Sequence, residues 1–206
     1  MLRDLAISDL LAAFSSPDPT PGGGSAAALS SAIGASLLLM VASLPKTRTS
    51  SDDDRAALAA AAGTLAGIRD RLTAAIDEDT AAYDGVVAAY RLPKGTGDEH
   101  AARKAAIQRA LQAATEVPLE VMKQSAGGLE QATVVAAHGY RSASSDVGVA
   151  LALLIAGTTG AKLNVDVNLG AIGDIGYRAA VGEEAGDLMA RAGASAQRAQ
   201  DLLRVG

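Results

Sequence analysis

The fold is decided by one stretch of sequence, GGGSAAALSSAIGASLLLMVASL, which occupies residues 22–44 between Pro21 and Pro45. The stretch carries no charge, and it predicts a helix from Ser25 to about Leu44 that is apolar on almost every face. A helix of this kind must be covered on all sides. We therefore expect it at the centre of a helical bundle or of a dimer.

The composition of the whole chain also favours closely packed helices. Of its 206 residues 49% are hydrophobic but only 2% are aromatic, and 22 are glycine. Small side chains let helix backbones approach closely, and alanine has the highest helix propensity. The net charge of −5 and the scarcity of aromatic residues argue against nucleic-acid binding. We expect an all-α protein with a single domain over residues 1–206.

The charge-free stretch is close to the length of a transmembrane helix, so a membrane span is an alternative. However, residues 26–44 are mostly small, with less than half Leu, Ile, Val and Met. Asp4, Asp9 and Asp18 precede the stretch in place of the basic cluster that is typical of membrane proteins. The sequence favours a buried helix in a soluble, cytoplasmic protein with no membrane partner.

Apolar residues at three-to-four spacing predict further helices along the chain. With the charge-free helix they give about seven or eight, over residues 2–14, 53–90, 98–115, 117–137, 144–162 and 174–203, with a short segment at 164–169. Ser8, Ser25 and Asp98 are the expected caps, and Pro118 is expected in a first turn.

The residue types that hold metals are scarce. The chain has no cysteine, which excludes disulfides, thiolate metal sites and a cysteine nucleophile. His100 and His138 are too far apart in sequence for a metal-ligand motif. The sequence therefore predicts no metal site.

Several clusters are candidates for a site, and each has an ordinary structural explanation. The glycines of residues 22–24 can turn backbone N–H groups toward a ligand, or they can permit close helix packing. Ser144, Ser145 and Asp146 can form a catalytic group or a helix cap. The amides of Asn164 and Asn168 can orient a heterocycle or satisfy backbone groups.

Two further clusters are weaker. The acidic run of residues 77–84, which includes Asp79 and Tyr83, can hold a catalytic carboxylate, although such a run usually forms a solvated helix face. The loop of residues 91–94 ends in Lys94, which can bind an anionic group or remain an ordinary surface lysine. None of the clusters identifies a reaction by itself.

Taken together, these segments resemble the C-terminal family of formiminotransferase-cyclodeaminases, which includes stand-alone methenyltetrahydrofolate cyclohydrolases. The resemblance is carried, in the order typical of the family, by PTPGGGS at 19–25, DTAAYDGVVAAYRLPK at 79–94, TEVPLEV at 115–121, Ser145-Asp146 and NVDVN at 164–168. It covers essentially the whole chain.

The resemblance implies an all-α homodimer that acts on a one-carbon tetrahydrofolate. Cyclodeaminases convert 5-formimino-tetrahydrofolate into 5,10-methenyl-tetrahydrofolate and release ammonia. Cyclohydrolases open the methenyl form to 10-formyl-tetrahydrofolate. Both reactions pass through a tetrahedral carbon between two nitrogens, and neither needs a metal or a redox cofactor.

The resemblance also implies a site. Asp146 is the first choice for the catalytic carboxylate and Asp79 the second, while Asn164 and Asn168 would orient the pterin. The other expected substrate-binding residues are Gly22, Gly23, Gly24 and Ser25 along the slot, Lys46, Arg48 and Lys94 at the glutamate tail, and Ser43, Tyr83, Tyr140 and Ser145.

The chain departs from the family pattern at Ser43, Tyr140 and Ser142, where many relatives carry amides, and at Pro45, where many carry threonine. Two alternatives to a folate enzyme therefore stay open. One is a cyclase, lyase or hydrolase for a small molecule other than a folate. The other is a catalytically silent dimeric binding protein.

Overall fold

The computed structural model describes residues 1–204, and helices account for most of them. The six α-helices are α1 (Ile7–Phe14), α2 (Gly23–Ala42), α3 (Asp52–Tyr90), α4 (Gly97–His138), α5 (Ser144–Ala171) and α6 (Ile175–Arg204). Two short 3-10 helices, η1 (Leu2–Asp4) and η2 (Arg141–Ala143), precede α1 and α5. The expected all-α class is confirmed, with six α-helices in the described part of the chain.

The expected count was higher because two predicted boundaries are not helix ends. Pro118 lies inside α4, so the two helices expected on either side of it form one helix of 42 residues. The segment with Asn164 and Asn168 continues α5 instead of leaving it. At the N-terminus, the helix expected over residues 2–14 is broken after Asp4.

The three predicted caps are also wrong by a few residues. Ser8, Ser25 and Asp98 lie inside the first turns of α1, α2 and α4, and the caps are Ala6, Gly22 and Thr96. At α4, Thr96 and Glu99 form a reciprocal capping box. Ser25 is instead turned toward α3, where its hydroxyl lies 2.9 Å from the Ile76 carbonyl oxygen. Sequence spacing does not reveal such a tertiary contact.

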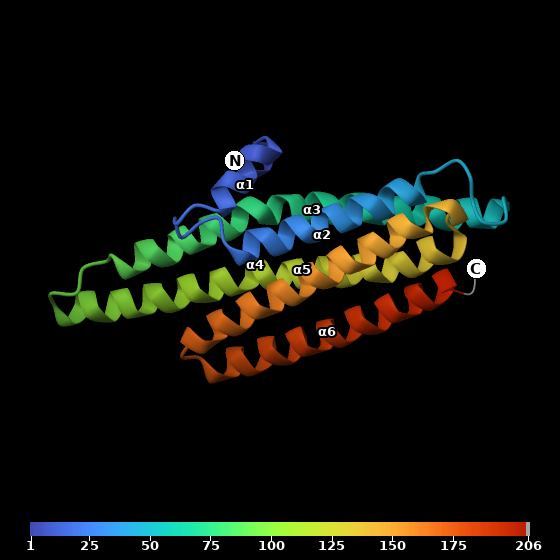
Figure 1. The fold of residues 1–206 in the computed structure, drawn as a ribbon. Helices are drawn as coiled ribbons and strands as arrows, with labels where there is room; N and C mark the ends of the chain where they lie inside the picture. Colours follow the sequence, from blue (N-terminus) through green and yellow to red (C-terminus); the bar gives the residue numbers. More distant parts are fainter. Residues whose placement is uncertain (205–206) are drawn as a thin grey trace.

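The Ala-rich helix α2 is largely buried, but the prediction that it is covered on all sides holds only in part within one chain, because Ile33 and Met40 on its outer face are exposed. It packs mainly against α3 and α5 and less extensively against α4, and Figure 1 shows it running alongside α3. The α2–α5 contact is close because small residues form it. A Cβ atom on Gly157 would lie 2.7 Å from the Ala27 carbonyl oxygen and would overlap the Ser31 hydroxyl.

Two segments, Gly23–Ala42 and Arg141–Ala171, are long and apolar enough to cross a membrane by length and composition. Core helices of soluble proteins have the same properties. More than half of the residues in the first segment are buried inside the bundle, which is the position of a core helix.

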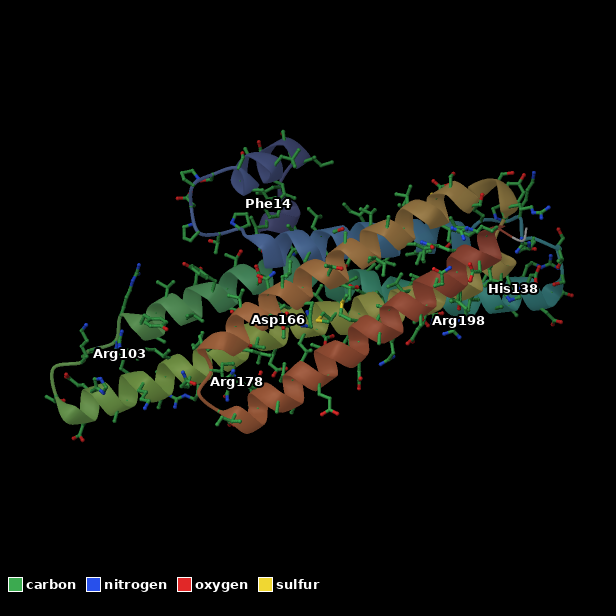
Figure 2. The ribbon with its side chains drawn as sticks, turned by 60° about the horizontal axis from the view of Figure 1, so that its bottom comes forward. Phe14, Arg103, His138, Asp166, Arg178 and Arg198 are labelled. Carbon is green, nitrogen blue, oxygen red and sulfur yellow. The ribbon has the colours of Figure 1, made fainter. Side chains whose placement is uncertain are left out.

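One end of the bundle is closed by a partly exposed ion pair between Asp54 and His138. Asp54, at the start of α3, lies 2.7 Å from Nδ1 of His138 and accepts hydrogen bonds from the backbone and hydroxyl of Thr49. The Arg48 guanidinium donates to the carbonyl groups of Ala136 and Ala137 at the end of α4. Figure 2 shows His138 at this end of α4 and Arg103 near the other.

This ion pair predicts acid-sensitive stability. Hydrogen bonds from Thr49 and His138 lower the pKa of Asp54 from 3.8 to about 2. The stabilisation is complete above the unfolded pKa, and it is lost as the pH falls through the folded pKa. Denaturant unfolding between about pH 5 and pH 2 should show a decline in stability that Asp54→Asn reduces. The exposed neighbour Asp53 provides the control, and an equal effect of Asp53→Asn would contradict the prediction.

Candidate active site

The candidate site is built around Asp79, a half-buried carboxylate in the middle of α3. The N-terminus of α2 meets it there. The backbone N–H of Ser25 donates to Asp79 Oδ2 over 2.9 Å, and the Ser25 hydroxyl lies 3.0 Å from the same oxygen. Positive partial charge at a helix N-terminus favours a carboxylate in this position. Asp79 is therefore held by a helix end and not by a cation.

Burial and hydrogen bonding act on Asp79 in opposite directions. Burial raises the pKa of the Asp79 carboxyl above its ordinary value, and the hydrogen bonds from Ser25 offset part of this rise. A carboxylate with a raised pKa is a stronger base than an exposed aspartate, so it is better suited to proton transfer. The pKa and the fixed orientation together are typical of a catalytic acid or base.

A cleft of about 310 Å³ opens beside Asp79, and segments distant in sequence form its walls. Its lining comes from the loop before α2 and from α2, α3, α4 and α5, and comprises Pro19, Thr20, Gly22, Gly23, Gly24, Asp79, Tyr83, Val86, Leu111, Ala114, Asn164 and Asn168. Apolar walls with a few polar groups are characteristic of small-molecule sites.

The two asparagines give the cleft its neutral polar groups. The side-chain N–H of Asn164 donates to the Gly160 carbonyl oxygen over 2.8 Å, and that of Asn168 donates to the Ala114 carbonyl oxygen over 3.0 Å. These bonds orient both amides and leave each Oδ1 as an acceptor. The arrangement suits a ring that carries N–H donors.

Gly24 must be a glycine for Asp79 to keep its position. A Cβ atom at residue 24 would overlap Asp79 Oδ1 and lie 2.8 Å from Oδ2. We therefore expect Gly24→Ala to displace the carboxylate and to lower turnover of the substrate by about 100-fold, because misplaced catalytic groups lose rates of this size. Steady-state kinetics will measure the loss.

Gly85 is the matched control for that substitution. It lies on the same helix as Asp79, and no atom would approach an added Cβ within 4 Å. Gly85→Ala should leave turnover unchanged. Equal activity of the Gly24→Ala and Gly85→Ala proteins would show that the Gly24–Asp79 contact does not control the site.

The structure brings one group of the predicted residues together and places another group elsewhere. Residues 22–24, Asp79, Tyr83, Asn164 and Asn168 line the cleft, and Ser25 binds Asp79. The predicted residues outside it are Ser43, Lys46, Arg48, Lys94, Tyr140, Ser145 and Asp146. Lys94 lies in the exposed loop between α3 and α4, and the other six lie near the opposite end of α5 from Asn164.

A smaller cleft of about 200 Å³ lies at that opposite end. Arg48, Tyr140, Arg141 and Ser144 line it, and the Lys46 ammonium group is 5.4 Å from the centre of the Tyr140 ring. Asp146 is eighteen residues from Asn164 on α5, which is about 27 Å along the helix. Within one chain, Asp146 is therefore too distant to act in the Asp79 cleft.

Comparison with known proteins shows the family to which the chain belongs. Residues 6–187 match the family described as formiminotransferase-cyclodeaminase. The chain belongs to this family. Most of the chain is included in the match, from α1 into the middle of α6.

Two family members show how the chain compares with characterised proteins. It is 39% identical over 138 residues to a methenyltetrahydrofolate cyclohydrolase of Methylorubrum extorquens, covering 67% of this chain and 66% of that protein. It is 32% identical over 133 residues to the formimidoyltransferase-cyclodeaminase of Sus scrofa, covering 65% of this chain. The matched region spans only 25% of the pig protein.

The fold of this family member also has a solved counterpart. A formiminotetrahydrofolate cyclodeaminase from Thermotoga maritima superposes with a TM-score of 0.88, covering 99% of this chain and 98% of that one. Sequence identity in that comparison is 24%, so it establishes the shared fold alone.

In this formiminotransferase-cyclodeaminase family member, the sequence reasoning missed five residues of the cleft. These are Pro19, Thr20, Val86, Leu111 and Ala114. Val86 is three residues after Tyr83 and seven after Asp79, so helical spacing could have identified it. Leu111 and Ala114 lie on α4 and gave no comparable signal, because their position depends on how α4 packs against α3 and α5.

Other features of this family member bear less on its chemistry. A larger open groove of about 580 Å³ lies along α4 and α6, but charged surface side chains such as Glu183, Asp187 and Arg191 line it. Among residues 1–204, no three His, Asp or Glu side chains are grouped so that they could hold a metal ion.

Proposed function

We propose that the chain is an enzyme that hydrolyses the cyclic C–N bond of 5,10-methenyl-tetrahydrofolate to give 10-formyl-tetrahydrofolate. The observation that carries the proposal is the Asp79 carboxylate, held by the α2 N-terminus in a cleft of suitable size. The 39% identity to a methenyltetrahydrofolate cyclohydrolase supports hydrolysis over the deamination that other family members are named for.

The reaction requires only proton transfer from the protein. The methenyl carbon is an amidinium carbon between N5 and N10, and it is already electrophilic. Asp79 takes a proton from a water molecule as the water oxygen bonds to this carbon, which gives a neutral tetrahedral intermediate. The bond from carbon to N5 then breaks, N5 takes up a proton, and the remaining hydroxyl becomes the formyl group on N10.

The carboxylate has a second effect on the same reaction. The substrate carbon carries delocalised positive charge, and an Asp79 carboxylate beside it would attract that cation in a partly dehydrated cleft. The acceptor oxygens of Asn164 and Asn168 would bind N–H groups of the pterin. Gly23 and Gly24 would let the flat ring approach the backbone closely, because neither has a side chain.

The proposed function also has implications for cofactors, cellular location and partners. Because the substrate is electrophilic without activation, the proposed chemistry uses no metal and no redox cofactor. We also propose a cytoplasmic protein without nucleic-acid or membrane partners, which its net charge of −5 and the burial of α2 support.

The direct test is turnover by the purified protein. The absorbance of the methenyl substrate should disappear in the presence of the protein faster than in buffer, and the rate should be unchanged by a metal chelator. Ammonia release from 5-formimino-tetrahydrofolate, measured in parallel, would reveal a cyclodeaminase. Turnover of the formimino compound alone would replace hydrolysis by deamination as the function.

Binding provides a separate test that does not need turnover. A reduced folate at about 100 times its Kd should stabilise the protein by about 2.7 kcal/mol, which corresponds to a rise in Tm of about 5–10 °C. The absence of both turnover and a change in Tm at saturating folate would refute the proposed function, and it would favour a ligand of another kind.

A further inference from the structure

The Ser25 hydroxyl lies between two acceptors and has one proton for both. Its oxygen is 2.9 Å from the Ile76 carbonyl oxygen and 3.0 Å from Asp79 Oδ2. Ser25 is completely buried, so bulk water does not reach its hydroxyl. A serine hydroxyl donates one hydrogen bond at a time. It therefore donates either to Ile76 or to Asp79, and not to both.

Thr80 leaves the Ile76 carbonyl oxygen to Ser25. A threonine inside a helix commonly donates its hydroxyl proton to the carbonyl oxygen four residues earlier. Four threonines of the bundle do so, namely Thr64, Thr73, Thr115 and Thr158. Thr80 is four residues after Ile76, yet its hydroxyl oxygen is buried and makes no hydrogen bond with the described residues. The Ser25 hydroxyl occupies the acceptor position that Thr80 would otherwise use.

The two carboxyl oxygens of Asp79 have different surroundings. Oδ2 accepts a hydrogen bond from the backbone N–H of Ser25 and lies within reach of its hydroxyl. Among residues 1–204, no group donates a hydrogen bond to Oδ1. Oδ1 is therefore the oxygen that can take a proton from a water molecule in the cleft, while Oδ2 stays bound to α2.

The charge of Asp79 decides which acceptor the Ser25 hydroxyl prefers. A carboxylate oxygen forms a stronger hydrogen bond than a neutral carbonyl oxygen, so an ionised Asp79 attracts the hydroxyl proton to Oδ2. After Oδ1 takes up a proton, Oδ2 is the carbonyl oxygen of a neutral acid. The backbone carbonyl of Ile76 is then the stronger acceptor, because a peptide carbonyl is more polarised than that of an acid.

The charge near Ser25 is set by Asp79 and not by a neighbour. Tyr83 is the other titratable residue that lines the cleft, and it lies on the same helix as Asp79. In the part of the chain that the structure describes, the loop before α2 and the helices α2, α4 and α5 add no titratable side chain to this lining.

We propose that Ser25 is a positioning residue whose hydroxyl changes its acceptor with the charge of Asp79. The hydroxyl donates to Asp79 Oδ2 while Asp79 is ionised and to the Ile76 carbonyl oxygen while Asp79 is protonated. The backbone N–H of Ser25 holds Oδ2 in both states. The exchange is a property of the free protein, whereas its part in turnover rests on the proposed function.

In the proposed hydrolysis, the exchange accompanies each proton transfer. A proton of the water molecule moves to Asp79 Oδ1 as the water oxygen bonds to the methenyl carbon, and the Ser25 hydroxyl turns to Ile76. When Asp79 gives that proton to N5, the hydroxyl turns back to Oδ2. No bond to the Ser25 oxygen breaks, so Ser25 keeps its own proton. The buried hydroxyl thus has an acceptor in both charge states of Asp79.

Carbon NMR of isotopically labelled protein tests the exchange without any use of activity. The carbonyl signal of Ile76 should move with pH at the same midpoint as the carboxyl signal of Asp79. Ser25→Ala should remove most of the Ile76 response. It should also move the Asp79 titration to higher pH, because the lost hydroxyl bond lowers the pKa of Asp79. An Ile76 signal that is independent of Asp79, or that follows it equally in Ser25→Ala, would overturn the exchange.

The pH dependence of turnover tests the part of Ser25 in the reaction. The profile of kcat/KM reports the ionisation of the free enzyme. Ser25→Ala should move its acid limb to higher pH, so that kcat/KM falls about tenfold on the acid side and less than about threefold on the plateau. A purely structural defect would lower kcat/KM by the same factor at every pH, and that result would refute the part of Ser25 in turnover.

Ser30→Ala is the matched control. Ser30 lies on the same helix, and its hydroxyl donates to the Leu153 carbonyl oxygen over 2.9 Å. This variant loses a hydroxyl bond between helices but no contact with a carboxylate, so the acid limb and the Ile76 signal should stay as in the natural protein. An equal displacement of the acid limb in Ser30→Ala would mean that the effect is not specific to Ser25.

The outcomes separate this inference from the proposed function. No turnover by the natural protein refutes the folate activity, and the NMR result still decides the exchange. Natural turnover with an acid limb that Ser25→Ala does not move refutes the part of Ser25 in the reaction and leaves the proposed function in place.

Discussion

Asp79→Asn should lower kcat for methenyl-tetrahydrofolate hydrolysis by about 1,000-fold, which is within the range that a positioned general base contributes. The amide keeps the size of the carboxyl group and can still accept a hydrogen bond from Ser25, but it cannot take a proton from water. KM should change much less than kcat. Absorbance kinetics at saturating substrate will measure both parameters.

Stability measurements separate this effect from unfolding. Because burial raises the pKa of Asp79, its ionised form destabilises the fold at neutral pH, and the neutral asparagine removes that penalty. The Asp79→Asn protein should therefore be at least as stable as the natural one. Asp84→Asn, an exposed substitution on the same helix, is the control and should be fully active. Undiminished activity of Asp79→Asn would remove Asp79 from the mechanism.

Gly157→Ala should destabilise the protein by about 2–3 kcal/mol, although alanine normally stabilises a helix relative to glycine. The added Cβ would overlap the Ser31 hydroxyl and lie 2.7 Å from the Ala27 carbonyl oxygen, so α2 and α5 would have to separate. Such a loss corresponds to a fall in Tm of about 4–12 °C for a chain of this size. Thermal and denaturant unfolding will measure the change.

Gly67→Ala is the matched control for this substitution. Gly67 lies on the exposed side of α3, and no atom would approach an added Cβ within 4 Å. The same chemical change should there raise stability by about 0.5–1 kcal/mol, because alanine loses less backbone entropy on folding. Effects of the same sign at both positions would show that the α2–α5 contact is not as close as described.

Much of the fold was predictable because the sequence is locally consistent. The uncharged stretch of α2 can be stable in water only if other helices cover it, and that alone indicated an all-α bundle. Helix ends were harder to predict. Pro118 is tolerated inside α4, and Ser25 is used for a tertiary contact instead of a cap. Both outcomes depend on neighbouring helices, which local spacing does not describe.

The candidate site was predictable in its parts but not in its assembly. The glycines, Asp79 and the two asparagines were all identified as candidates, and the packing of α2, α3 and α5 brings them to one cleft. The family resemblance ranked Asp146 above Asp79, whereas the structure places Asp79, and not Asp146, in the cleft. The Asp79 carboxylate meets a helix end that is more than fifty residues away in the chain, and only the packed structure shows that contact.

The close contact of α2 with α5 has a consequence for how such a protein diverges. Groups without rotamers, mainly Gly157 and the backbone of Ala27, set the spacing of these two helices. Because the N-terminus of α2 holds Asp79 and α5 carries Asn164, the spacing of α2 and α5 contributes to the distance between these two residues of the cleft. Related proteins can lose most of their sequence identity and still keep the same spacing of these helices. Divergence can therefore change which molecule the cleft accepts before it changes the positions of the helices that form the cleft.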